Sequence, residues 1–143
     1  MSRTLFTNIR IFDGTGSQPF SGEVLLADNR ITRVAKGGER IDAPDAEVVN
    51  GEGGTLMPGM ALCHCHLTFP VAVDRKPKGG ESFLQRALPV EKQTLIAAHN
   101  AKVVMDYGFT SAYSAGGSTY SLEANLRDEI NEGWIPGPRL LAA

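Results

Sequence analysis

The second half of the chain alternates between strand-like and helix-like segments, and this order restricts the fold more than any other feature. Apolar, β-rich runs at 61–68, 109–115 and 139–142 are separated by segments with helical spacing of apolar residues, 90–107 and 121–132. Gly108 and Gly133 follow these two segments and are predicted to end the helices. Strand–helix–strand order is typical of parallel β/α units. We therefore predict an α/β region in which parallel strands are joined by helices.

The first 57 residues show a different pattern, with short β-rich runs that end at turn residues. These runs are 4–12, 23–27, 31–35, 47–50 and 55–57, and 41–46 is predicted to be a loop because it is polar and contains Pro44. Asp28-Asn29-Arg30 suits a tight turn between two of the runs. We predict a small antiparallel β-domain over 1–57, followed by β/α units over 58–143.

Two histidines, His64 and His66, lie within the predicted strand 61–68, shortly after Pro58-Gly59. Because side chains alternate along a strand, the two imidazoles are expected on one face, with the neighbouring cysteines on the other. Imidazole nitrogen is a good ligand for zinc and similar divalent metals. This pattern predicts half of a metal site.

The chain has two cysteines, Cys63 and Cys65. In a strand their Cα atoms would lie about 6.5–7 Å apart, at the limit for a disulfide, so we predict reduced and buried thiols. An alternative is a structural metal cluster formed by Cys63, His64, Cys65 and His66. That cluster requires a loop, whereas the apolar flanks favour a strand that would send these side chains to two faces.

The stretch Met57–Leu67, MPGMALCHCHL, resembles the first barrel strand of the amidohydrolase superfamily, which commonly reads Pro-Gly-x-x-Asp-x-His-x-His. Leu62 stands where the family usually has Asp. The segment 108–117, GFTSAYSAGG, is similar to the second β/α unit of imidazolonepropionase-like and prolidase-like members. Those members often carry Arg-Asp where this chain has Tyr113-Ser114.

This resemblance implies a TIM-like (β/α)8 barrel preceded by a small β-sandwich, of which the chain covers only the first barrel strands. A barrel needs about 250 residues, and this chain has 143. We therefore expect a missing segment or companion polypeptide to complete the barrel, and the chain alone to be inactive. The family implies that the later strands supply a lysine or glutamate, two histidines and an aspartate base. The catalytic residues are thus expected outside this chain.

The implied activity is hydrolysis of an amide or other C–N bond in a small non-peptide or dipeptide-like substrate by metal-activated water. His64 and His66 are the implied ligands of one or two divalent ions, with zinc the expected metal.

Tyr113 and Ser114 are candidate substrate contacts at a strand end, and the alternative is that Tyr113 packs under the next helix. His99 lies inside a predicted helix and is expected to be structural or solvent-facing.

The segment Thr68–Pro89 lacks a sustained period and contains several Gly and Pro residues, which predicts a long loop. Loops at the carboxyl ends of barrel strands build active sites. The loop is either a lid that shapes the substrate site or a plain surface excursion.

Composition excludes several classes of function. Fourteen Lys and Arg against 16 Asp and Glu leave a net charge of −2, which gives no argument for binding nucleic acid or an anionic membrane. No apolar run approaches the roughly 20 residues of a membrane helix. We expect the protein to be cytoplasmic, and we also expect it to be a homo-oligomer. Two other functions stay open: a non-catalytic barrel serving as scaffold or binding subunit, and a free β-domain with an αβ appendage that binds a partner.

Overall fold

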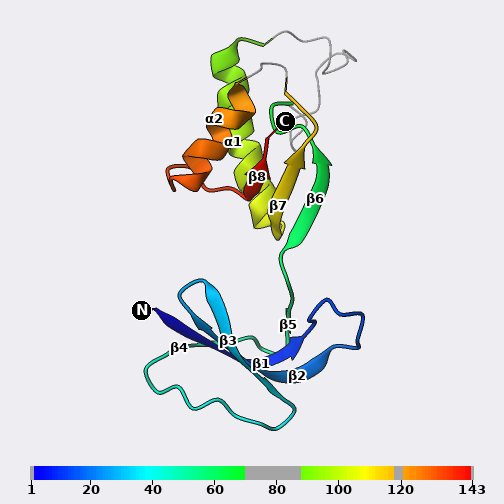
Figure 1. Cartoon of the computed structure of the whole chain (residues 1–143), viewed down its shortest axis with the longest axis vertical. Coiled ribbons are helices and arrows are strands. Elements are labelled where there is room, and N and C mark those ends of the chain that lie inside the picture. The colour runs from blue at the N-terminus through cyan, green and yellow to red at the C-terminus, as the bar shows by residue number, and fades with distance from the viewer. Residues whose placement is uncertain (1, 70–87, 118–120, 143) are drawn as a thin grey trace. The chain divides into compact units, whose positions relative to one another are not determined.

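The computed structural model describes residues 2–69, 88–117 and 121–142. The chain divides into two compact units, Met1–Pro58 and Gly59–Ala143. Figure 1 shows strands in the first unit and a mixture of strands and helices in the second. The predicted α/β character is confirmed for the second unit.

The N-terminal unit is one sheet of five strands. They are β1 (Arg3–Ile11), β2 (Phe20–Ala27), β3 (Arg30–Lys36), β4 (Glu47–Asn50) and β5 (Thr55–Leu56). The strand order is β3-β2-β1-β4, and β5 also pairs with β1. The pairs β1–β2 and β2–β3 are antiparallel, as predicted, whereas β4 and β5 run parallel to β1.

The prediction of an entirely antiparallel unit is therefore wrong, and the connection between β3 and β4 explains why. Ile41 and Ala43, in a segment predicted to be a polar loop, are buried in a core cluster with Leu5, Leu25 and Ala35. Burial of these apolar side chains stabilises a connection that crosses to the other side of β1. The chain then continues in the same direction as β1.

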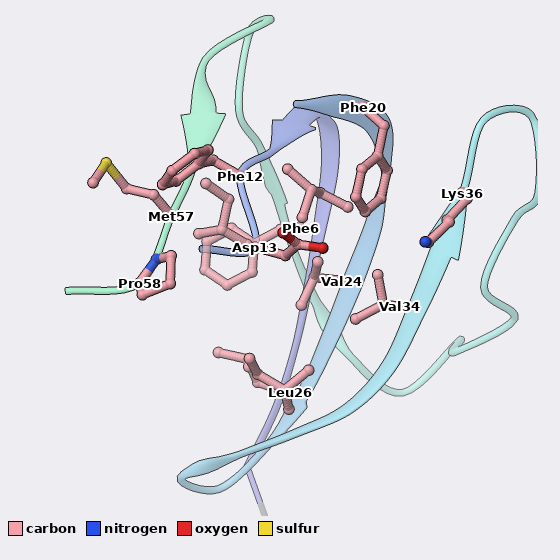
Figure 2. Close-up of a pocket in the computed structure, with 13 residues that line it drawn as sticks. Phe6, Phe12, Asp13, Phe20, Val24, Leu26, Val34, Lys36, Met57 and Pro58 are labelled. Atoms are coloured by element: carbon pink, nitrogen blue, oxygen red, sulfur yellow. The ribbon is translucent and has the colours of Figure 1, made fainter. Parts of the chain in front are cut away.

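One face of this sheet is hollowed over about 500 Å³ and lined almost entirely by apolar side chains. In Figure 2, aromatic and aliphatic groups from β1, β2 and β3 surround the hollow, with Met57 and Pro58 at one side. Lys36 and Asp13 are its charged residues, and the Lys36 ammonium lies 4.6 Å from the centre of the Phe20 ring.

The described residues of the C-terminal unit form two strand–helix–strand repeats that share their middle strand. Its elements are β6 (Met60–Cys65), α1 (Val90–Asp106), β7 (Phe109–Ser114), α2 (Leu122–Asn131) and β8 (Arg139–Leu141). The strand order is β6-β7-β8, and both pairings are parallel. The prediction of parallel strands joined by helices is confirmed. Most of the predicted loop 68–89 lies in 70–87, outside the described residues.

The two helices pack against the sheet through an apolar core. This cluster contains Leu67, Ala97, Ala101, Ala112, Leu122, Leu126 and Leu140. Small alanines on α1 and β7 let the helix approach the sheet closely, so α1 buries Ile96, Ala97, Asn100 and Ala101. Leu95, in the same helix, is 73% exposed.

Glycines end both helices as predicted. Gly108 follows α1 with a φ of 86°, and Gly133 follows α2 with a φ of 83°. These positive φ values suit glycine because it has no Cβ. Among the described residues, no helix is both long and apolar enough to cross a bilayer.

Candidate metal centre

The carboxyl ends of β6 and β7 lie side by side because these strands are parallel. Cys65 pairs with Ser114 in their register, so the residues that follow the two strands meet at one edge of the sheet. His64 lies near the end of β6 and His66 directly after it. In open and closed parallel sheets, this edge is where ligands and substrates bind.

The regular alternation predicted for this strand is interrupted. The β6–β7 register shifts between Leu62 and Cys65, and both of these side chains pack against the helix-side core. Cys63 is exposed instead, so the prediction that both thiols are buried is wrong. No disulfide joins them, as predicted.

The rings of His64 and His66 are close neighbours despite this shift. Their centroids lie 5.1 Å apart with an angle of 84° between the ring planes. Two imidazoles that ligate one tetrahedral zinc ion at roughly 2.0–2.1 Å have centroids about 5 Å apart. The spacing of this pair therefore fits two ligands of one metal ion.

His66 is held by two further contacts. Its Nδ1 atom lies 2.7 Å from the carbonyl oxygen of Gly116, and its ring stacks on Phe69 at 4.5 Å with 15° between the planes. Because a carbonyl only accepts hydrogen bonds, Nδ1 must carry the proton, which leaves Nε2 as the acceptor atom. Donation from the second ring nitrogen to a carbonyl is typical of metal-ligating histidines.

The turn that follows His66 is fastened to α1 by a buried side chain. Asn100 donates from Nδ2 to the carbonyl oxygens of Leu67 at 2.7 Å and Phe69 at 2.9 Å. Sequence reasoning missed this contribution. A polar residue on the buried face of a helix was the available signal, since such a group needs a partner.

Among the described residues, no group of three or more His, Cys, Asp or Glu side chains converges on one point. Cys63, His64, Cys65 and His66 are all described, so the alternative of a structural cluster made by these four is wrong. Burial, reinforced by Glu123, raises the pKa of the Cys65 thiol to about 11. At neutral pH this thiol stays protonated, and a protonated thiol is a poor metal ligand.

The chain was also compared with known protein families and solved structures. No family model matches the chain. Over 99% of its length, however, it is similar to a Xaa-Pro dipeptidase solved with methionine in the active site, at 28% identity and a TM-score of 0.80. It is similar over the same share to an amidohydrolase, at 24% identity and 0.77, and to molinate hydrolase, at 21% and 0.77.

The resemblance to the amidohydrolase superfamily is confirmed. The chain covers 33%, 31% and 30% of these three structures, about a third of each. What it shares with the amidohydrolases is therefore a region that includes the candidate ligands His64 and His66.

Tyr113 and Ser114, the candidate substrate contacts, lie at the carboxyl end of β7. The Tyr113 side chain is 46% exposed, and its carbonyl oxygen lies 3.4 Å from the Cys65 sulfur. The Ser114 hydroxyl donates to the carboxyl group of Glu123 and accepts a hydrogen bond of 3.0 Å from the Gly116 N–H. Their assignment as substrate contacts stays a prediction.

Two further ionisable residues of the C-terminal unit, His99 and Glu123, differ in their exposure to solvent. His99 is exposed on α1, whereas Glu123 is only 2% exposed. Sequence reasoning did not single out Glu123, because an acidic residue in the first turn of a helix is ordinary on dipole grounds alone. Its burial depends on packing against the β7 turn, which the sequence pattern does not reveal.

Proposed function

We propose that this chain is part of a metal-dependent hydrolase that cleaves an amide or other C–N bond with metal-activated water. The observation that carries the proposal is the 5.1 Å spacing of the His64 and His66 rings at the carboxyl ends of parallel strands. The similarity to hydrolases, among them a Xaa-Pro dipeptidase and molinate hydrolase, supports the same class.

His64 and His66 would hold the metal, for which zinc suits a pair of imidazoles. A divalent ion held there would lower the pKa of a water molecule to about 7 and would act as a Lewis acid toward the scissile carbonyl. The role of this chain is to present the His66 ring in a fixed orientation through Gly116 and Phe69.

The remaining ligands and the base would come from elsewhere. A hydrolytic metal site uses about three protein ligands and an open position, and the described residues provide two. We propose that a missing segment or companion polypeptide supplies the rest, that the chain alone is inactive, and that the complete protein is a cytoplasmic homo-oligomer. The substrate would be small and non-peptide or dipeptide-like.

A second candidate is a non-catalytic amidohydrolase-like scaffold or binding subunit. Leu62 favours it, because the family commonly has Asp at this position. Leu62 packs against the apolar core and cannot orient a metal ligand by hydrogen bonding.

Metal analysis separates the two candidates. The protein, purified with any polypeptide that accompanies it, should contain one or two zinc ions per site and hydrolyse members of an N-acyl amino acid and dipeptide panel. Each of the variants His64→Ala and His66→Ala should lose at least about tenfold in zinc content and activity. The matched control is His99→Ala, which removes an exposed imidazole from α1.

The opposite outcome is equally clear. If the complete, folded protein contains no metal and His64→Ala changes neither its stability nor its binding of partners, the hydrolase proposal is wrong. The scaffold function would then be the better explanation.

A further inference from the structure

Glu123 is a buried ionisable residue that the proposed hydrolysis does not use. It lies in the first turn of α2 and is 2% exposed. One carboxyl oxygen, Oε2, accepts the hydrogen bond from Ser114, and Oε1 has no hydrogen-bond partner among the described residues. Burying a carboxyl group costs free energy that a single hydrogen bond offsets only in part. We therefore looked for a function of the Glu123 carboxyl group in its contacts with neighbouring residues.

Glu123 is connected to His66 through a continuous line of hydrogen bonds. Ser114 donates to Glu123 and accepts from the Gly116 N–H at 3.0 Å. The Gly116 carbonyl in turn accepts from His66 Nδ1 at 2.7 Å. We call these four residues the Glu123–His66 network.

The turn inside this network needs an external constraint. Gly116 has a φ of 100°, a conformation that glycine adopts as readily as many others, so the backbone alone does not hold the carbonyl in place. The next residue, Gly117, is wedged between two side chains. A Cβ at Gly117 would lie 3.2 Å from Thr68 and 3.4 Å from Glu123. Glu123 therefore contacts the turn by packing as well as through Ser114.

We propose that Glu123 and Ser114 are positioning residues that hold the Gly116 carbonyl against His66. By fixing this acceptor, they keep His66 in the tautomer with the proton on Nδ1 and leave Nε2 free to bind a metal ion. The metal-binding part of this inference rests on the proposed function. The tautomer of His66, however, is a property of the metal-free protein and can be measured without a metal ion. It gives Ser114 a role distinct from the predicted substrate contact.

The direct test is the tautomer of each histidine, read from ¹⁵N–¹H multiple-bond NMR spectra of metal-free protein. In spectra recorded at a pH of about 8, the wild-type His66 ring should carry its proton mainly on Nδ1. In Ser114→Ala, the ratio of Nδ1–H to Nε2–H at His66 should fall about three- to tenfold, the effect of weakening one hydrogen bond.

Two substitutions at Glu123 sharpen this test. Glu123→Gln keeps an acceptor oxygen for Ser114 and should preserve the tautomer, whereas Glu123→Leu removes the acceptor and should shift it as Ser114→Ala does. His99 is an internal reference in every spectrum because it is exposed and outside the network. Glu23→Gln is the matched control, since Glu23 is a buried glutamate, 4% exposed, in the N-terminal unit.

Zinc titration then links the network to the metal. If wild type binds zinc, Ser114→Ala and Glu123→Leu should bind it about 10–100-fold more weakly, while Glu123→Gln stays near wild type. An unchanged His66 tautomer in folded Ser114→Ala would overturn the inference, as would a changed tautomer with unchanged zinc affinity. If the complete wild-type protein, purified with any polypeptide that accompanies it, binds no zinc, the proposed function fails, and the tautomer measurements still decide whether the network acts on His66.

Discussion

At the scale of single residues, the segment 63–66 places neighbouring side chains in opposite surroundings. Cys63 is exposed, while Cys65 is half-buried against the helix-side core with its thiol pKa raised to about 11 by burial and by Glu123. Only the thiolate is nucleophilic. Because the pKa of the Cys65 thiol is raised, its thiolate is scarce at neutral pH and increases as the pH approaches 11.

We therefore predict selective alkylation of Cys63 by iodoacetamide. At a pH of about 8, Cys65 should react more than tenfold more slowly, since each unit of pKa is a factor of ten in thiolate. Peptide mass spectrometry over a time course measures both rates, and the rate at Cys65 should rise with pH. Cys63→Ser, in which only Cys65 can react, is the control. Equal rates at the two cysteines would show that Cys65 is not shielded.

At the scale of elements, β6 and β7 approach each other closely where β6 begins. A Cβ at Gly59 would lie 2.0 Å from the Thr110 hydroxyl oxygen and 2.7 Å from the Thr110 Cβ. A methyl group there cannot be accommodated unless the strands separate. Separation would also disturb the register that brings His66 and Gly116 together.

Gly59→Ala is thus expected to destabilise the C-terminal unit by about 1–3 kcal/mol, the usual cost of overpacking. Hydrogen exchange of the β6 and β7 amides, with a urea titration, measures the effect. Gly38→Ala is the matched control, because nothing lies within 4 Å of a Cβ at that glycine. In a double-mutant cycle, Thr110→Gly should recover part of the loss. Additive losses would place the strain somewhere other than this contact.

At the scale of the whole molecule, the N-terminal sheet carries an apolar face and an edge strand. Ile31 on β3 is 67% exposed and Val34 is 43% exposed, and both line the hollow in the sheet. β3 pairs with β2 alone among the described strands. Exposed apolar surface beside an unpaired edge favours self-association.

We predict that Ile31→Lys reduces aggregation of the chain about twofold or more, because a charge on an edge strand opposes intermolecular pairing. Light scattering at fixed concentration measures aggregation, and the urea midpoint should change little since the side chain is exposed. Asn29→Lys adds the same charge in the neighbouring exposed turn and controls for net charge. An equal reduction in both variants would mean that charge alone, rather than this face, governs aggregation.

Local chemistry along the chain was enough to predict the order of strands and helices and the glycines that end α1 and α2. It also predicted that the rings of His64 and His66 lie next to each other. These features depend on side-chain periodicity, turn propensity and short sequence spacing, all of which act within a few residues. The resemblance to amidohydrolases rested on the same short stretches.

Contacts between distant segments determined the rest. The parallel pairing of β4 with β1 depends on where Ile41 and Ala43 are buried. The different exposure of Cys63 and Cys65 depends on a register shift against β7. The Glu123–His66 network joins residues 57 positions apart. Spacing along the chain cannot encode these outcomes, because burial and hydrogen-bond partners depend on which surfaces meet once the elements have packed.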